Sequence, residues 1–268
     1  MSRHLTQLLA RLQLQSAVLV TVVQAQGSVP RDAGAWMAVF ADCVVNTVGG
    51  GHLEQDAIAE ARAMLAHVDA PPQTLRFALG PRLGQCCGGV VHLQLEVIRA
   101  ADSAALQTRL RQTGPAVALF GGGHVGHALV RVLGDLPFAV QWIDSRDAIF
   151  PGELPPNVVC EQSEPVQSAV AHLPAQARVL IMSFSHAEDL DIVAACLLRQ
   201  RAHGDLRFIG LIGSQTKWAT FRKRLLARGF TDAELAQVTS PIGVPGIPGK
   251  APEVIAVAVA AQLLQLGD

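Results

Sequence analysis

The sequence predicts an α/β protein with two domains. After about residue 113, β-branched strands alternate with helical segments, and a glycine-rich turn joins the first of these strands to its helix. Before that point the strands come in pairs, with few helices between them. Strands that alternate with helices form parallel sheets covered by helices on both faces. We therefore expect an N-terminal α+β domain over residues 1–112, followed by a Rossmann-type doubly wound parallel sheet domain over residues 113–268.

The first domain is expected to mix strands and helices irregularly. Its strands are expected at residues 17–25, 36–40, 43–48, 74–79 and 90–98, and its helices at residues 1–16, 53–67 and 101–115. The two strands over 36–40 and 43–48 flank a short Ala41-Asp42 turn, which is typical of a hairpin. The last helix ends at Gly114-Pro115, where we place the domain boundary.

The second domain alternates regularly. Its strands are expected at residues 116–120, 138–144, 178–184 and 207–213, and its helices at residues 125–136, 188–201, 216–229 and 252–266. Pro252 stands in the first turn of the last helix, where a missing N–H costs nothing. Asp189 and Asp191 are expected to cap their helix. A basic cluster is expected to form a solvated helix face, with a docking patch for an acidic partner as the alternative, and it consists of Lys217, Arg222, Lys223, Arg224 and Arg228.

Composition excludes several classes of protein. The formal net charge is −1 and only 16% of residues are charged, so nothing indicates a nucleic-acid partner. No uncharged apolar stretch reaches 18 residues, which argues against a membrane span. The N-terminus lacks the apolar region and cleavage site of a signal peptide, so we expect a cytoplasmic protein. Five irregularly spaced cysteines indicate free thiols rather than a disulfide framework.

A phosphate-binding loop is predicted where the first strand of the second domain ends. Gly121, Gly123 and Gly126 match the G-x-G-x-x-G pattern between a strand and a helix. The glycines allow a tight turn, close approach of a pyrophosphate and close helix packing, while the helix start supplies N–H donors. Asp144 ends the next strand, where an acid accepts hydrogen bonds from a ribose diol or a similar ring. A Rossmann domain that binds nothing remains an alternative.

A second glycine run is open to two interpretations. Gly49–Gly51 joins a strand to a helix whose first turn carries Glu54. In one interpretation, the N–H groups and dipole of the helix start form a second anion site. In the other, the glycines only allow a tight turn where helix and sheet pack closely.

Two adjacent cysteines occupy a glycine-rich loop. Cys86 and Cys87 follow Gln85 and precede two glycines. Neighbouring side chains point apart, so the two thiols do not form a relaxed disulfide. They lack the paired spacing of a zinc site. A pair of thiols on such a loop suits a thiophilic metal such as molybdenum, or sulfur handling, and the alternative is a pair of small residues in a turn.

Several longer motifs occur along the chain. The first half carries GSVPRDAGAWM, VGGGHLEQDAI and LGQCCGGVVHLQLE. The second half carries FGGGHVGHALV, WIDSRDAIFP, SFSHAEDLDI, FIGLIGSQTKWATFRKRL and SPIGVPGIPGKAPEVIAVAVAA. Together these motifs resemble those of the XdhC/CoxI family, accessory proteins for the maturation of xanthine dehydrogenase. The resemblance covers nearly the whole chain in order. It departs from the usual Thr-Pro-Glu-Glu-Ile run at Ala251 and Val254, which affects only the start of the last helix.

This resemblance implies a maturation chaperone without turnover chemistry of its own. Proteins of this family bind the molybdenum cofactor, a pyranopterin phosphate that carries molybdenum on a dithiolene. They protect the cofactor while a NifS-type cysteine desulfurase supplies a terminal sulfido ligand, and then pass it to the apo-enzyme of a xanthine dehydrogenase. We also expect a homo-oligomer.

The resemblance and the loop chemistry together give a set of expected cofactor contacts. The phosphate would lie at Gly121, Gly123 and Gly126, and Cys86 or Cys87 would approach the molybdenum. Arg31 and Gln85 would hydrogen-bond to pterin or oxo groups. The remaining candidates are polar groups on the ligand side of the second domain, namely His124, Asp144 and His186. For the two histidines a purely structural role is the alternative.

The main alternative function is an NAD(P)-dependent oxidoreductase that uses the Gly121–Gly126 loop. Such an enzyme needs a proton donor and a substrate clamp near the nicotinamide, and no such set stands out in the sequence. It would also leave the segment Gln85–Gly89 without a role. Whether the loop holds a pterin phosphate, a nucleotide or nothing stays open at this point.

Overall fold

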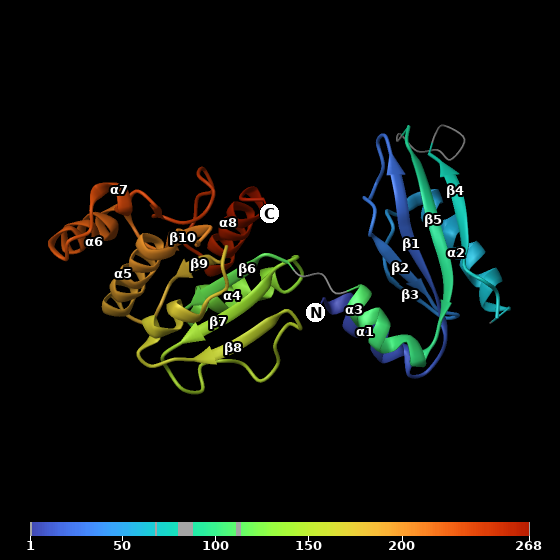
Figure 1. Ribbon diagram of the computed structural model, residues 1–268, viewed down its shortest axis with the longest axis horizontal. Helices are drawn as coiled ribbons and strands as arrows, with labels where there is room; N and C mark the ends of the chain where they lie inside the picture. The colour runs from blue at the N-terminus through green and yellow to red at the C-terminus, as the bar shows by residue number, and fades with distance from the viewer. Residues whose placement is uncertain (1, 68, 80–87, 111–113, 268) are drawn as a thin grey trace. The chain divides into compact units, whose positions relative to one another are not determined.

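The chain forms two compact units, each with its own sheet. A computed structural model describes residues 2–67, 69–79, 88–110 and 114–267 (Figure 1). One unit is His4–Arg111, and the other is Gln112–Asp268 grouped with Met1–Arg3. The first unit holds an antiparallel sheet and the second a parallel sheet, so the predicted α/β class is confirmed.

The N-terminal unit is a five-stranded sheet in the order β3-β2-β1-β5-β4. Its strands are β1 (Ala17–Gln26), β2 (Trp36–Val39), β3 (Val44–Asn46), β4 (Gln73–Ala78) and β5 (Val90–Ile98). Its helices are α1 (Arg3–Leu12), α2 (Gly51–Leu65) and α3 (Ser103–Arg109), with a 3-10 turn η2 at Ala100–Asp102. Helix α2 packs on the sheet through Leu53, Ala57 and Ala61, which recur every fourth residue and therefore share one helix face.

The C-terminal unit is a six-stranded parallel sheet in the order β11-β10-β9-β6-β7-β8. Its strands are β6 (Ala116–Phe120), β7 (Ala139–Asp144), β8 (Val158–Gln162), β9 (Arg178–Ile181), β10 (Phe208–Leu211) and β11 (Val238–Thr239). Its helices are α4 (His124–Leu133), α5 (His186–His203), α6 (Gln215–Ala227), α7 (Asp232–Leu235) and α8 (Pro252–Gln265), with a 3-10 segment η3 at Val166–His172. This strand order is that of a doubly wound dinucleotide-binding sheet, and its direction of progression reverses between β6 and β9.

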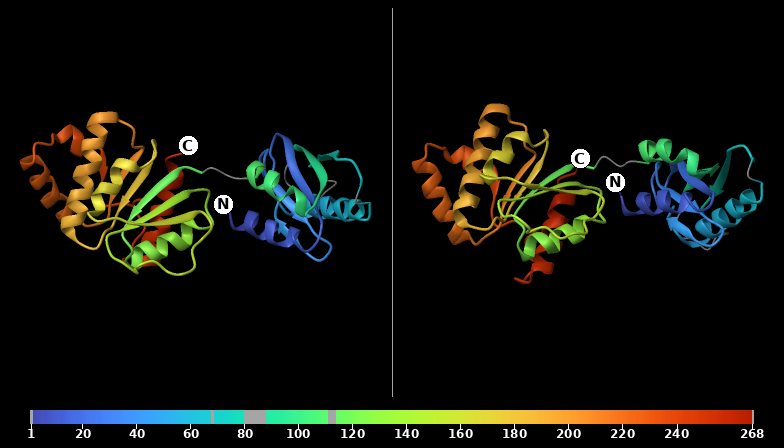
Figure 2. Two further views of the ribbon diagram at one scale, coloured as in Figure 1. Left: turned by 60° about the horizontal axis from the view of Figure 1, so that its bottom comes forward. Right: turned by 90° about the horizontal axis from the view of Figure 1, so that it is seen from below.

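Helices cover both faces of the parallel sheet. Figure 2 shows α4 and α8 on one face and α5 on the other. Side chains alternate along β6, so that Val117 and Leu119 pack with α4 and α8, while Ala118 and Phe120 pack with α5 and η3. Cys196 of α5 is fully buried in the core, and burial raises the pKa of its thiol to about 12.

The sequence did not predict four short elements. They are β8, η3, α7 and β11. Strand β8 lies at a sheet edge and is only partly buried, so its sequence VVCEQ lacks a long apolar run. Among the described residues, no helix combines the length and the apolar character needed to span a membrane.

Candidate functional site

The three fingerprint glycines of the C-terminal unit have different neighbours. Gly121 has φ +126°, and a Cβ atom there would lie 2.0 Å from the Met182 carbonyl oxygen. A Cβ atom at Gly126 would lie 2.1 Å from the Gly121 carbonyl oxygen. Packing therefore requires glycine at both positions. At Gly123, in contrast, no heavy atom of the described chain lies within 4 Å of an added Cβ atom. The middle glycine faces open space, where a ligand can approach the backbone.

Helix α4 begins directly at this open position. Gly123 is its N-cap residue, and no side chain of the described residues caps the helix start by a hydrogen bond. The first N–H groups of a helix and its dipole favour a bound anion. His124 is the first residue of α4 and is exposed beside this start. The arrangement suits a phosphate group.

Asp144 ends β7 as predicted, but its carboxylate is already engaged. Its Oδ2 accepts from the Gly122 amide at 2.5 Å and from Arg146 Nη2 at 2.9 Å. Its Oδ1 accepts from the Arg146 amide and from Arg146 Nε, each at 2.9 Å. Burial alone would raise the pKa of Asp144, but hydrogen bonds from Arg146 and Gly122 outweigh it and hold the pKa below the ordinary value.

A buried ion pair joins the first turns of α5 and α6, the helices that follow β9 and β10. Asp189 Oδ1 accepts from the Ser183 amide at 2.8 Å and from Ser183 Oγ at 2.7 Å. Its Oδ2 accepts from Lys217 Nζ at 2.6 Å, and Nζ also donates to the Ile212 carbonyl at 2.9 Å. The prediction of a solvated Lys217 was wrong, because only 12% of its side chain is exposed. The helix cap is Ser185, whose hydroxyl accepts from the Glu188 amide, rather than Asp189.

Three residues at this edge make contacts that were not predicted from the sequence. Arg146 and Phe184 follow the ends of β7 and β9, and Lys217 lies in the first turn of α6 after β10. Each of them follows the carboxyl end of a strand, and this position was the one sequence signal that could have indicated a place near the site. His186 begins α5, is exposed, and lies edge-on to Phe221 with 6.2 Å between ring centroids.

In the N-terminal unit, the signature motifs meet at one end of the sheet. A Cβ atom at Gly89 would lie 2.5 Å from the Gln26 carbonyl oxygen and 2.6 Å from that of Ser28. A Cβ atom at Gly49 would lie 2.5 Å from Pro30 Cγ. The backbone segments around these residues are therefore in direct contact.

The expected cofactor contacts of this unit are only partly described. Arg31 is exposed beside the contact of Pro30 with Gly49. Gln85, Cys86 and Cys87 lie outside the described residues, so their expected contacts stay predictions. Within the described ranges, no group of three or more His, Cys, Asp or Glu side chains could hold a metal ion.

The Gly49–Gly51 turn holds a carboxylate of the chain itself. Glu54 Oε2 accepts from the Gly50 amide at 3.1 Å, from the Val48 amide at 3.2 Å and from the Thr47 hydroxyl. The N–H groups before α2 therefore bind Glu54, and this favours the tight-turn interpretation over a second anion site.

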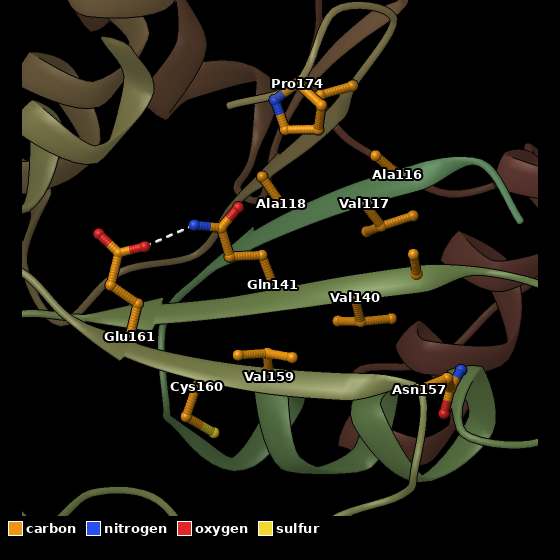
Figure 3. A pocket seen from close by; sticks show the side chains of 12 residues that line it. Ala116, Val117, Ala118, Val140, Gln141, Asn157, Val159, Cys160, Glu161 and Pro174 are labelled. Carbon is orange, nitrogen blue, oxygen red and sulfur yellow. Dashed lines mark hydrogen bonds between the residues drawn. The ribbon is translucent and has the colours of Figure 1, made fainter. Parts of the chain in front are cut away.

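A cavity of about 490 Å³ lies elsewhere on the C-terminal unit. Figure 3 shows small side chains such as Ala116 and Ala118 around it, with Gln141 donating to Glu161 at its margin. Most of its lining comes from the amino-terminal halves of the strands, whereas the glycine loop follows the carboxyl end of β6. Ligands of doubly wound sheets bind at the carboxyl ends, so we do not assign the cavity to the glycine-loop site.

The strand order and the glycine-rich turn between β6 and α4 place the C-terminal unit in the class of Rossmann domains. The family described as "XdhC Rossmann domain" matches residues 117–263, and that described as "XdhC and CoxI family" matches residues 10–78. Because the first match alone covers more than half of the chain, this protein belongs to the XdhC/CoxI family.

Individual relatives are more distant. The uncharacterized protein YqeB of Escherichia coli is 25% identical over 265 residues, which are 96% of this chain and 45% of that protein. The chain thus spans less than half the length of that curated relative. A solved structure described as a xanthine dehydrogenase from Bacillus halodurans is 22% identical, with a TM-score of 0.74 over 99% of this chain and 96% of that one. At this identity the likeness concerns the fold.

A Rossmann-fold NAD(P)-binding family protein from Shigella flexneri is also similar in part. It is 18% identical, and the match covers 55% of this chain and 85% of that one. The TM-score of 0.35 is too low to support any conclusion about this chain.

Proposed function

We propose that this protein is a molybdenum-cofactor chaperone that serves the maturation of a xanthine dehydrogenase. It binds the pyranopterin phosphate, holds it while a NifS-type cysteine desulfurase supplies the sulfido ligand, and passes it to the apo-enzyme. The observation that carries the proposal is the open position at Gly123 in front of α4, in a chain that belongs to the XdhC/CoxI family. We include in this proposal that the protein is a homo-oligomer and delivers the cofactor in the cytoplasm.

The donor groups of the chain fit the two ends of this cargo. The start of α4 offers N–H donors and a positive dipole end to the phosphate. Arg31, whose guanidinium is exposed, can donate to pterin or oxo oxygens. Thiolates are the ligands that a soft metal prefers, which gives Cys86 and Cys87 their role in the proposal. His124 and His186 are further exposed side chains that can donate at the carboxyl edge of the sheet.

Cofactor retention tests the phosphate end of the proposal. The protein would be loaded with cofactor released from a molybdoenzyme, and pterin and molybdenum would be measured after gel filtration. Gly123→Asp puts a negative charge in the open position and should lower retention about 10-fold or more. Gly152→Asp is the matched control, because it too meets no described heavy atom within 4 Å but lies outside the loop. Equal retention by both variants would contradict the proposal.

Replacement of the cysteine pair tests the metal end. Cys86→Ala/Cys87→Ala should lose molybdenum faster than wild type and should activate apo-xanthine dehydrogenase less, with the desulfurase present. Cys43→Ala/Cys160→Ala removes two partly buried thiols elsewhere and should behave as wild type. If both double variants retain molybdenum and activate the apo-enzyme like wild type, the proposed role of the pair is wrong.

An NAD(P)-dependent oxidoreductase is not the function we favour. The acid that would receive a ribose diol is Asp144, and its hydrogen bonds are taken up by Arg146 and Gly122. Stoichiometric hydride transfer from NADPH to an acceptor, abolished in Gly123→Asp, would reverse this preference.

A further inference from the structure

Two contacts cross the carboxyl end of the sheet at the switch point, where the strand order reverses between β6 and β9. Ser145 Oγ donates to Glu188 Oε1 at 2.6 Å. The Arg146 guanidinium carbon lies 4.7 Å from the centre of the Phe184 ring. Ser145 and Arg146 follow β7, whereas Phe184 follows β9 and Glu188 lies in the first turn of α5. Because β6 lies between β7 and β9, both contacts pass across the carboxyl end of β6, where the glycine loop begins.

A dinucleotide would have to occupy the same space. In doubly wound sheets the pyrophosphate lies at the helix after the first strand, and the acid that ends the second strand receives the ribose hydroxyls. These positions correspond to α4 and Asp144. A carboxylate has about four lone-pair positions. The described residues already make four hydrogen bonds to Asp144, three of them from Arg146. A ribose diol can bind this carboxylate only if Arg146 leaves it.

The segment after β7 also covers part of the loop. A Cβ atom at Gly122 would lie 2.5 Å from Ile149 Cγ1. Phe184 is 66% exposed, and the guanidinium of Arg146 lies against its ring. The Phe184 ring thus lies beside the Arg146 guanidinium, where a nucleotide base could otherwise contact it. Gly123 remains open beside this covered region.

We propose that Arg146 and Phe184 determine the ligand specificity of the glycine-loop site at this switch point. They close the half that would receive a nucleoside, so the site takes a ring compound that ends in a phosphate monoester and rejects the same compound extended by a nucleoside. The inference rests on the proposed function only in taking the glycine loop as the phosphate site. If the proposed function is correct, the closed site selects the form of the molybdenum cofactor that carries no nucleotide extension.

The test opens the closed half and measures binding of ADP-ribose, which supplies a base, a ribose diol and a pyrophosphate. By titration calorimetry, wild type should bind ADP-ribose only weakly, with a Kd on the order of 1 mM or above. Arg146→Ala/Phe184→Ala should bind it about 10-fold more tightly or better. The control is Arg201→Ala/Leu198→Ala on α5, which removes another arginine that lies over an aromatic ring, together with an exposed leucine. The control should bind as wild type.

Three further results decide the inference. Phe184→Ala alone leaves the ion pair of Asp144 with Arg146 intact, and should give a smaller gain even if the double variant does not fold. Gly123→Asp, added to whichever variant gains binding, should remove the gain. The inference is overturned if wild type binds ADP-ribose as tightly as the opened variants, if folded Phe184→Ala and the double variant gain nothing, or if Gly123→Asp leaves the gain unchanged.

Cofactor retention by wild type separates this inference from the proposed function. If wild type does not retain the molybdenum cofactor but the opened variants bind ADP-ribose more tightly than wild type, the proposed function fails and the specificity inference stands. If wild type retains the cofactor and also binds ADP-ribose as tightly as the opened variants, the function stands and the specificity inference fails.

Discussion

The amide of Gly122 donates to the carboxylate of Asp144 at 2.5 Å, and this bond ties the glycine loop to the end of β7. Because only 2% of Asp144 is exposed, its charge depends on that bond and on the ion pair with Arg146. The acid therefore stabilises the glycine loop in the folded chain.

Asp144→Asn should destabilise the protein in a pH-dependent way. Since the folded pKa lies below its ordinary value of 3.8, the ionised carboxylate contributes stability that is fully present above the unfolded pKa and is lost as pH falls through the folded pKa. We expect a loss of about 2–3 kcal/mol near neutral pH, because charged hydrogen bonds are removed. The difference from wild type should shrink below about pH 4.

Urea unfolding at several pH values measures this effect. Asp147→Asn, at an exposed neighbouring acid, should change stability by less than about 0.5 kcal/mol. A difference for Asp144→Asn that stays constant down to about pH 3 would show that the ionised form is not what stabilises the loop.

The fingerprint glycines should differ in their tolerance of alanine. At Gly121 a methyl group meets the Met182 carbonyl oxygen and φ is positive, so Gly121→Ala should cost about 2–4 kcal/mol. At Gly123 the space is open, so Gly123→Ala should cost no more than about 1 kcal/mol, the scale of a changed N-cap residue. Denaturant midpoints compare the two variants. Equal losses would contradict the different roles assigned to these positions.

Lys217→Ala should be among the more damaging substitutions of a charged residue. It leaves the buried carboxylate of Asp189 without its cation, which should cost about 3–5 kcal/mol. Lys223→Ala, on an exposed position of the same helix, should stay within about 0.5 kcal/mol of wild type. A double-mutant cycle with Asp189→Ala should give a coupling energy of about 1–3 kcal/mol, and a coupling near zero would rule out a stabilising pair.

Glu54→Ala should uncover the start of α2. The backbone amides of Val48 and Gly50 lose their acceptor, and we expect a loss of about 1 kcal/mol, as for a removed helix cap. Added phosphate should then raise the melting temperature of the variant more than that of wild type. Glu60→Ala, an exposed acid on the same helix, serves as the control and should respond to phosphate as wild type does.

Local signals made the fold and the glycine loop predictable. The strand at residues 116–120, the spaced glycines and the helix after them each follow from neighbouring residues. Strand β8 was missed because an edge strand buries little of its surface, so the pattern in VVCEQ is weak.

The side-chain partners at the carboxyl edge were not predictable in the same way. Asp189 and Lys217 are 28 residues apart, and they meet only because β9 and β10 are neighbours in the sheet. Arg146 and Phe184 come together across β6 because the strands that precede them, β7 and β9, flank β6 in the sheet. A sequence pattern gives each of these residues a position after a strand end, but the pairing depends on the order of the strands.

The carboxylate of Glu54 acts as a tethered competitor at the start of α2. Because it is covalently attached only a few residues from the amides that it occupies, its effective concentration there is on the order of millimolar or higher. A free anion has to exceed that concentration, or bind more strongly than a carboxylate, before it can displace Glu54. The two glycine turns of this chain therefore differ: the Glu54 carboxylate accepts from the amides before α2, whereas no side chain of the described residues caps the start of α4.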